Sequence, residues 1–271
     1  MAGRLRIVFL LMAAAGAVAV ARAESASPPL VCAGVTEAVG GAVRVVDARA
    51  LELGDGRVLR LAGIEPFDLL SAGGDQAAAE LQGRLAELVK DAAVRIELLS
   101  QEPDRYGRLA ALVWAGGELV QDVAAREGLA LAFASGAALP CFEKILAAEA
   151  EARRARRGFW RKVRVPAAFP EALAARIGGF AIFEGRVLSV GNRRARSYLN
   201  FGRRWTEDVT VEIAEDDRAL FGGEEGLAAL AGRRVRVRGF LEEKGGPMLV
   251  LRSPMQIEAL DPAKETSGHA P

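Results

Sequence analysis

Two short charged runs, each next to an expected strand, constrain this chain most strongly. Residues 60–68 are Arg-Leu-Ala-Gly-Ile-Glu-Pro-Phe-Asp, and residues 104–108 are Asp-Arg-Tyr-Gly-Arg. Arginine forks bind phosphate oxygens in pairs and stay charged at any relevant pH. Carboxylates can hold a hard cation or orient a water molecule. The two runs supply the groups that phosphodiester hydrolysis needs, but on charge alone weak surface ion pairs are the commoner explanation, so the order and spacing of further motifs must decide.

Composition narrows the possible chemistry. The 271 residues are 51% apolar and 26% charged, which is typical of a globular chain long enough for two modest domains. The net charge of +1 does not indicate nucleic acid, so a binding surface would need local segregation of charge. The single histidine, His269, lies in a polar tail, which argues against a Ser-His-Asp triad or a histidine metal cluster. Two cysteines cannot build a cysteine-only zinc site.

The N-terminus predicts an export signal over residues 1–23. Arg4 and Arg6 precede an uncharged apolar stretch over residues 7–20, and Ala-Arg-Ala at 21–23 has the form of a cleavage site. The apolar stretch is shorter than a bilayer span needs. We therefore expect export to the periplasm or the outside and no stable membrane span after the signal is removed. A retained anchor is the alternative.

Export implies an oxidising compartment, and this bears on the two cysteines. Cys32 follows the signal, in a polar lead segment over residues 24–38, and Cys141 lies far along the chain. In such a compartment the sequence predicts that Cys32 and Cys141 form a disulfide. Two free buried thiols are the alternative.

Hydrophobic periodicity in residues 39–163 predicts strands alternating with helices. Apolar residues alternate over 42–64, and Gly-Asp-Gly at 54–56 predicts a hairpin turn. The segments after residue 64 show either helical spacing or strand-like patterns of apolar residues. The helices are expected over 75–91, 119–129 and 142–157, and the strands over 94–99 and 108–114. This order suits a small β-barrel with packed helices, so the fold class is mainly β.

A second β-rich unit is expected over residues 175–260, after a linker over 164–174. Three strands, a helix and further strands form the order of an OB-fold, which predicts a second OB-like barrel. The expected strands are 180–190, 197–201, 209–213, 233–238, 247–251 and 257–260, with a helix within 216–230. The polar tail over 261–271 is predicted to be disordered.

Several landmarks in residues 39–163 occur together and in a fixed order. They are Val-Val-Asp at 45–47, the turn at 54–56, Arg-Leu-Ala-Gly-Ile at 60–64, Asp-Arg-Tyr-Gly-Arg at 104–108, Arg-Glu-Gly-Leu-Ala at 126–130, and Gly-Phe-Trp at 158–160. In this order the segment resembles the thermonuclease family, that is, staphylococcal nuclease-like domains. The resemblance implies an OB barrel with a calcium ion beside it, and phosphodiester hydrolysis in DNA or RNA with weak sequence preference.

The resemblance also implies roles for particular residues. Arg60 and Arg108 match the two arginines that bind and stabilise the phosphate. Asp68 matches the catalytic glutamate. Asp47 and Glu65 match carboxylates at the metal site. Tyr106 and Phe133 match positions that line the nucleotide pocket.

The sequence departs from the family at the metal loop. Arg49 stands where a direct calcium ligand is expected, and a guanidinium cannot coordinate a cation. Asp68 is one methylene shorter than the usual glutamate, and displacements of about 1 Å can lower a rate ~100-fold. Two interpretations follow. Arg49 could swing outward and leave a weakened metal site, or pair with Glu65 or Asp68 and replace the metal.

The second unit carries basic residues interleaved with aromatic ones, as single-stranded nucleic-acid binding uses. The candidate contacts are Arg193, Arg194, Arg196, Tyr198, Arg203, Arg204 and Trp205. Arg234, Arg236 and Arg238 alternate along one expected strand and would add to this basic face. The alternative is that the aromatic residues belong to the core and the arginines form a solvated rim.

Three functions remain open from the sequence. The first is an exported nuclease that uses calcium. The second is an inactive descendant without a metal that binds nucleic acid or a protein in the cell envelope. The third is a purely structural role with no nucleic-acid affinity. The sequence does not predict an oligomeric state.

Overall fold

A computed structural model describes residues 36–39, 42–70, 74–134, 139–204 and 207–261. The predicted signal over 1–23, Cys32 and most of the predicted tail lie outside the described residues. Within them, no helix is both long and apolar enough to cross a membrane.

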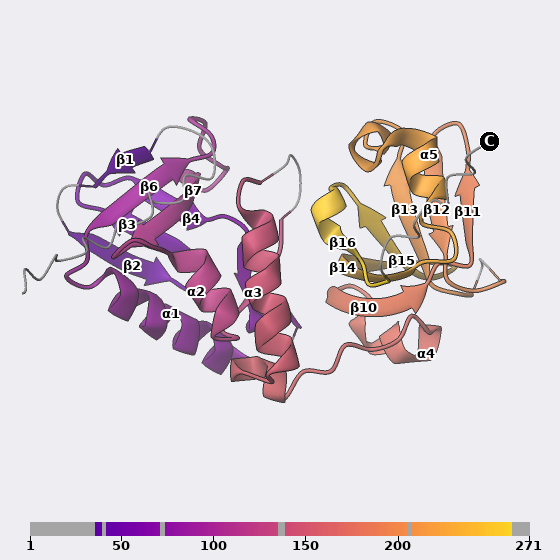
Figure 1. Ribbon diagram of the computed structural model, residues 1–271, viewed down its shortest axis with the longest axis horizontal. Helices are drawn as coiled ribbons and strands as arrows, with labels where there is room; N and C mark the ends of the chain where they lie inside the picture. The colour runs from indigo at the N-terminus through magenta and orange to yellow at the C-terminus, as the bar shows by residue number, and fades with distance from the viewer. Residues whose placement is uncertain (1–35, 40–41, 71–73, 135–138, 205–206, 262–271) are drawn as a thin grey trace, which may run out of the picture. The chain divides into compact units, whose positions relative to one another are not determined.

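Two curled sheets organise these residues, which confirms the mainly β fold class with two barrel-like units (Figure 1). The strands of the first sheet are β1 Thr36–Ala38, β2 Val43–Asp47, β3 Ala50–Leu53, β4 Val58–Leu61, β6 Val94–Leu98, β7 Arg108–Ala115 and β8 Glu118–Leu119. Their order is β1-β6-β7-β4-β3-β2, with β8 paired to β7. The pair β4–β7 is parallel and the other pairs are antiparallel.

The second sheet repeats this arrangement. Its strands are β10 Phe180–Arg186, β11 Ser189–Asn192, β12 Arg196–Asn200, β13 Thr210–Ala214, β14 Arg234–Lys244, β15 Gly246–Leu251 and β16 Ile257–Ala259. Their order is β10-β14-β15-β13-β12-β11, with β16 paired to β14. Here β13–β15 is the parallel pair. In both sheets, three successive strands, a helical segment and two more strands follow the order expected of an OB barrel.

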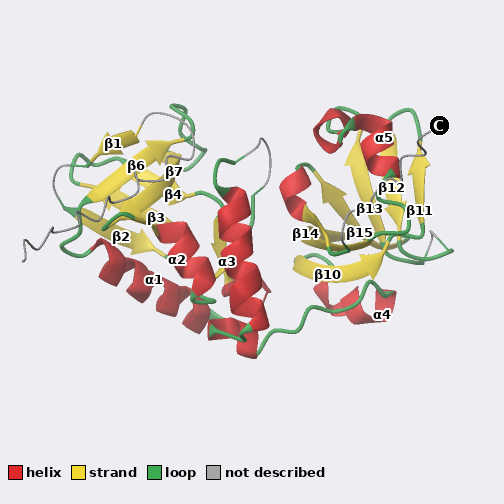
Figure 2. Ribbon diagram, viewed as in Figure 1, coloured by secondary structure: helices red, strands yellow, loops and turns green. Residues whose placement is uncertain are grey.

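Three longer helices lie beside the first sheet, whereas the helices of the second unit are short (Figure 2). They are α1 Asp75–Val89, α2 Val120–Arg126 and α3 Phe142–Arg154. In α1, Ala77, Leu81, Leu85 and Val89 recur every fourth residue and are buried, so one face of the helix packs into the core. The expected helices at 75–91, 119–129 and 142–157 are thus confirmed, each slightly shorter than predicted.

The ends of α2 and α3 meet at two glycines. Gly128 has φ +73° and Gly158 has φ +49°, and the backbones approach closely enough for Phe159 N–H to donate to Gly128 O at 2.9 Å. A Cβ on Gly128 would lie 2.4 Å from Arg157 O. Only glycine fits this junction. Gly158 is the first residue of the 3₁₀ helix η2 Gly158–Arg161, whose Phe159 and Trp160 belong to a buried cluster.

Some boundaries differ from those expected. Strand β1 lies inside the predicted lead segment and pairs with β6. The predicted linker contains α4 Pro170–Leu173, whose Leu173 is buried in the core of the second barrel. The single strand expected at 180–190 is two strands, because β10 pairs with β14 while β11 pairs with β12. The helix expected within 216–230 is split into η4 Arg218–Phe221 and α5 Gly223–Ala228, with Gly222 between them at φ +77°.

Candidate functional site

Five elements carry the residues of the candidate site. The turn between β2 and β3 presents Arg49, β4 presents Arg60, and β7 begins at Arg108. The short strand β5 Ile64–Pro66 carries Glu65 and pairs with β9 Ala130–Ala132. The 3₁₀ helix η1 Phe67–Leu70 follows β5 directly and carries Asp68.

The two predicted phosphate-binding arginines share one face of the first sheet. In the parallel pair β4–β7, Val58 lies beside Arg108 and Arg60 beside Ala110. Residues two apart on a strand share a face, so Arg60 and Arg108 emerge on the same side of neighbouring strands. Leu59 and Leu61 are buried on the opposite side. The sheet therefore places the backbones of the two arginines side by side on one face.

Arg49 lies between the carboxylates of the site. Its Nε lies 2.7 Å from Glu65 Oε2, and its Nη2 lies 2.9 Å from Asp68 Oδ1. Its backbone N–H donates to Asp47 Oδ1 at 2.6 Å, which fixes the turn. Burial alone lowers the pKa of Arg49, but hydrogen bonds and charge from Glu65 and Asp68 outweigh it and raise the pKa above its usual value. Arg49 is therefore a fixed positive charge in the site.

Glu65 is bound on both of its oxygens. Oε2 accepts from Arg49, and Oε1 accepts from Arg60 Nη2. Its side chain is nearly buried, and both of its oxygens have the hydrogen-bond partners that a buried carboxylate requires. Asp68 is more exposed, and both of its oxygens accept from Arg49 Nη2.

A calcium ion needs several free oxygen ligands around one point. Here the oxygens of Glu65 and Asp68 already face the Arg49 guanidinium. The described part of the chain contains no group of three or more acidic, histidine or cysteine residues arranged to hold a metal. The residues as placed do not fit calcium, and Arg49 would have to leave before Asp47, Glu65 and Asp68 could approach one.

Arg108 is held by Asp104 in the preceding turn. Its Nη2 lies 2.8 Å from Asp104 Oδ2, while Oδ1 accepts from the backbone N–H groups of Tyr106 and Arg108. These bonds, the one from the Arg108 side chain first, lower the pKa of Asp104 to about 2. Sequence reasoning did not assign Asp104 to Arg108. The i, i+4 spacing in the run over residues 104–108 was the available signal.

The two predicted nucleotide-pocket residues lie in different surroundings. Tyr106 is 65% exposed, and Arg105 and Arg108 lie 4.9 and 5.0 Å from its ring centre. Phe133 is buried, with Phe180 of the second barrel edge-on to its ring at 4.9 Å. A base would have to displace Phe180 to stack on Phe133.

The predicted basic face of the second barrel is only partly free. Arg193 and Arg194 are exposed, whereas Arg196 pairs with Glu212 and Arg204 with Glu207. Arg203 is exposed, Tyr198 is half-buried on β12, and Trp205 lies outside the described residues. The candidate residues on and around β12 thus remain a prediction.

The expectation that Arg234, Arg236 and Arg238 extend this basic face is wrong. They do share one face of β14, but Arg236 and Arg238 are buried. Arg234 and Arg236 pair with Glu184, and Arg238 pairs with Glu149 and Glu258. The acidic partners come from distant segments, so strand periodicity could not show them.

Comparison with known proteins shows what the first barrel is similar to. Residues 72–162 match the family described as "Staphylococcal nuclease homologue". The chain contains a staphylococcal nuclease-like domain. Over 67 residues it is 39% identical to the thermonuclease of Staphylococcus hyicus. That alignment covers 25% of this chain and spans only about 40% of the length of the Staphylococcus hyicus protein.

The family match contains one half of the candidate site of this nuclease-like domain. It includes Asp104, Tyr106 and Arg108, whereas Arg49, Arg60, Glu65 and Asp68 precede it. The parallel pairing of β4 with β7 brings the two halves together.

Proposed function

We propose that this protein is an exported, thermonuclease-like enzyme that hydrolyses phosphodiester bonds in DNA or RNA with weak sequence preference. The single observation that carries the proposal is the placement of Arg60 and Arg108 on one face of neighbouring parallel strands, with Glu65 and Asp68 nearby. Two forks on one face can bind the oxygens of one phosphate. The family match at residues 72–162 supports the same activity.

The proposed chemistry assigns separate tasks to these side chains. Arg60 and Arg108 bind the phosphate and stabilise the charge that develops on it during attack. Asp68 orients or activates the attacking water, for which it must release at least one oxygen from Arg49. Tyr106, exposed beside Arg108, offers a ring on which a neighbouring base could stack.

Arg49 favours a second candidate function. Its ion pairs with Glu65 and Asp68 occupy the carboxylates that a calcium ion would need. A domain closed in this way would bind nucleic acid, or a protein of the cell envelope, without cutting. The first candidate function would use calcium, and the second would use no metal.

A cleavage assay separates the two candidates. Single-stranded DNA and RNA are incubated with the purified protein, with calcium and with a chelator, beside the variants Arg60→Ala and Arg108→Ala. Cutting that falls about 10²–10³-fold in either variant supports the nuclease, because each variant removes a group that stabilises transition-state charge. Binding without cutting, weakened in the same variants, supports the second candidate. Neither cutting nor nucleic-acid binding, even at low salt, contradicts the nuclease and leaves only a protein as the ligand of the second candidate.

We further propose that the second barrel assists by holding single-stranded substrate on Arg193, Arg194, Arg196, Tyr198, Arg203, Arg204 and Trp205. Two of these arginines are exposed at the turn before β12, where charge can reach phosphates. Filter binding of an oligonucleotide to the Arg193→Ala/Arg194→Ala variant tests this. Unchanged affinity contradicts it.

Export is part of the proposal and is supported by the N-terminal sequence alone. In an oxidising compartment Cys32 would pair with Cys141, which lies directly before α3. Intact mass with and without reductant, on protein recovered from the periplasm, tests both the cleavage at residue 23 and the disulfide.

A further inference from the structure

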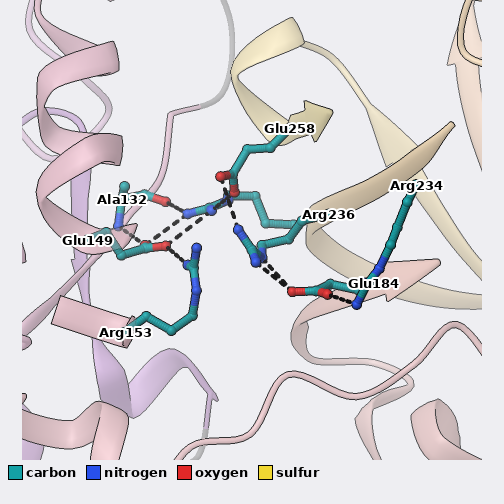
Figure 3. A network of polar contacts seen from close by, with 8 residues as sticks. Ala132, Glu149, Arg153, Glu184, Arg234, Arg236 and Glu258 are labelled. Atoms are coloured by element: carbon teal, nitrogen blue, oxygen red, sulfur yellow. Dashed lines mark hydrogen bonds and ion pairs between the residues drawn. The ribbon is translucent and has the colours of Figure 1, made fainter. Parts of the chain in front are cut away.

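A buried charge network connects the second barrel to the nuclease-like domain (Figure 3). Both barrels fall within one compact unit of the chain. Arg238 of β14 and Glu149 of α3 are fully buried, and Arg238 Nη1 lies 2.9 Å from Glu149 Oε2. Arg238 also binds Glu258 of β16, and Arg153 Nη1 lies 2.8 Å from Glu149 Oε1. We call Arg238, Glu149, Arg153 and Glu258 the interbarrel network.

Because the interbarrel network is buried, its charged groups must keep their pairing geometry. A buried charge is tolerated only when it is paired and hydrogen-bonded, and removing one partner leaves the other uncompensated. Burial lowers the pKa of Arg238, but Glu149 and Glu258 raise it more, so the guanidinium stays charged. The network can therefore hold a neighbouring backbone segment firmly.

The segment that it holds is strand β9. Ala132, the last residue of β9, donates its N–H to Glu149 Oε2 at 2.7 Å, and its carbonyl accepts from Arg238 Nη1. Both polar backbone groups of Ala132 thus contact the interbarrel network (Figure 3). Across the ladder, Ala132 lies beside Ile64 of β5, and the adjacent pair is Leu131 with Glu65. The network therefore ends one residue pair away from Glu65.

The second barrel also contacts η1, the 3₁₀ helix that carries Asp68. Arg176 Nη1 donates to Leu70 O at 3.3 Å, at the end of η1, which carries Asp68. Phe67 and Leu70 of η1 share a buried cluster with Phe180 and Ile182 of β10. Of the two elements that carry the carboxylates bound by Arg49, η1 thus contacts the second barrel directly, and β5 is linked to it through β9.

We propose that Arg238 is a positioning residue of the candidate site: by fixing β9, and through it β5, it sets the position of Glu65 from the second barrel. The effect on activity rests on the proposed function, whereas the effect on Glu65 and Arg49 does not. The second barrel then has a task in the site itself, in addition to any contact with substrate.

The test compares Arg238→Met with Arg234→Met in the full chain. Both residues lie on the same face of β14, but Arg234 is exposed and pairs with Glu184 of its own barrel. Amide exchange is measured at Ala132 and Leu131, each relative to Ile96 of β6, which corrects for a loss of global stability. Arg238→Met should raise the relative exchange about tenfold or more, since it removes a buried hydrogen bond of β9. Arg234→Met should leave it within about twofold of wild type, as substitution of an exposed pair should.

A second readout reports on the site itself. The Arg49 Nε–H resonance should shift in Arg238→Met and stay in place in Arg234→Met, because the Glu65 oxygen that binds Arg49 moves with β5. If Arg238→Met does not fold, Arg238→Lys and Glu149→Gln provide the same comparison with a smaller change. Lysine keeps the charge, so it should retain part of the wild-type behaviour.

Activity separates this proposal from the proposed function. If the wild type cuts nucleic acid, Arg238→Met should lower kcat about tenfold with little change in KM, because Glu65 holds Arg60, which stabilises charge on the phosphate during attack. If the wild type neither cuts nor binds, the proposed function fails, and the exchange and Arg49 measurements still decide the role of Arg238. Unchanged relative exchange and an unchanged Arg49 resonance, with only a lower melting temperature, would overturn it.

Discussion

Arg49 and Glu65 form an ion pair in which Nε and Oε2 lie 2.7 Å apart, so that a guanidinium occupies the position beside Glu65 where the resemblance to thermonucleases predicts a metal. Of the two interpretations left open by the sequence, this contact follows the one in which Arg49 turns inward. Hydrolysis of phosphodiesters at this site then depends on how readily Arg49 moves away from Glu65 and Asp68.

The variant Arg49→Asp should give the site an affinity for calcium. It removes the guanidinium from Glu65 and Asp68 and adds a third carboxylate near them. At about a hundredfold excess over Kd, calcium should stabilise the variant by about 2.7 kcal/mol, which thermal unfolding will detect.

The matched control is Arg49→Met, which removes the charge without adding an oxygen ligand. Calcium should leave its melting temperature unchanged, as in the wild type. An equal shift for both variants would mean that the ion binds elsewhere.

The Asp104 carboxyl should titrate far below its normal range. Its pKa of about 2 reflects first the bond from the Arg108 side chain, and then the backbone bonds from Arg108 and Tyr106. A carboxyl whose pKa is lower in the folded state stabilises the fold above its unfolded pKa of about 3.9, and that contribution disappears as the pH falls through the folded value. The window of loss is therefore from about pH 4 down to about pH 2.

Carboxyl carbon chemical shifts followed by NMR will give the Asp104 midpoint directly. Arg108→Lys should raise it, because lysine cannot make the paired contact of Nε and Nη2. A wild-type midpoint near 4 would show that Arg108 is free in solution.

Gly128→Ala should be strongly destabilising. The residue has φ +73°, and an added Cβ would lie 2.4 Å from the carbonyl oxygen of Arg157. We expect a loss of more than about 2 kcal/mol in the free energy of unfolding, since the backbone conformation and the contact are both unfavourable.

Gly116→Ala separates these two causes. Gly116 has φ +59°, but an added Cβ meets nothing within 4 Å. Its loss should be about 1–2 kcal/mol, the penalty of the backbone conformation alone. Equal losses at the two positions in denaturant titrations would rule out the close contact.

Tyr106→Ala should weaken binding of single-stranded nucleic acid by about 1–3 kcal/mol, as the loss of one stacked base does. The ring is 65% exposed and lies against Arg105 and Arg108. Phe240→Ala is the control, because Phe240 is 53% exposed on β14. Fluorescence anisotropy with a short oligonucleotide will show a weaker complex for Tyr106→Ala only. Equal losses would indicate general stickiness of exposed rings.

The sequence was sufficient for the three longer helices and for the order of most strands. The spacing of Leu81 and Leu85 marked one face of α1, and Gly54 to Gly56 marked the hairpin, because these signals are local. The departure at Arg49 was also visible from position alone. Such features depend on residues a few positions apart, which periodicity and turn chemistry describe well.

The partners of buried charges could not be predicted in this way. Arg238 is part of a strictly alternating strand, and alternation indicates a shared face but not what covers it. Its partner Glu149 lies on a helix of the other barrel, 89 residues away. The contact of Phe133 with Phe180 of the second barrel could not be predicted for the same reason. Contacts between barrels leave no pattern within either segment.

The repeated strand order of the two barrels has a consequence for how this chain reaches its native state. Each barrel closes through a parallel pair whose strands are distant in sequence, Val58 beside Arg108 in one and Thr210 beside Met248 in the other. Such closures are slow, because loop entropy is lost before the contacts form. Glu149 and Arg238 can lose their water only after both closures. We therefore expect their pairing to come late in assembly, so that the candidate site acquires its final shape together with the whole molecule.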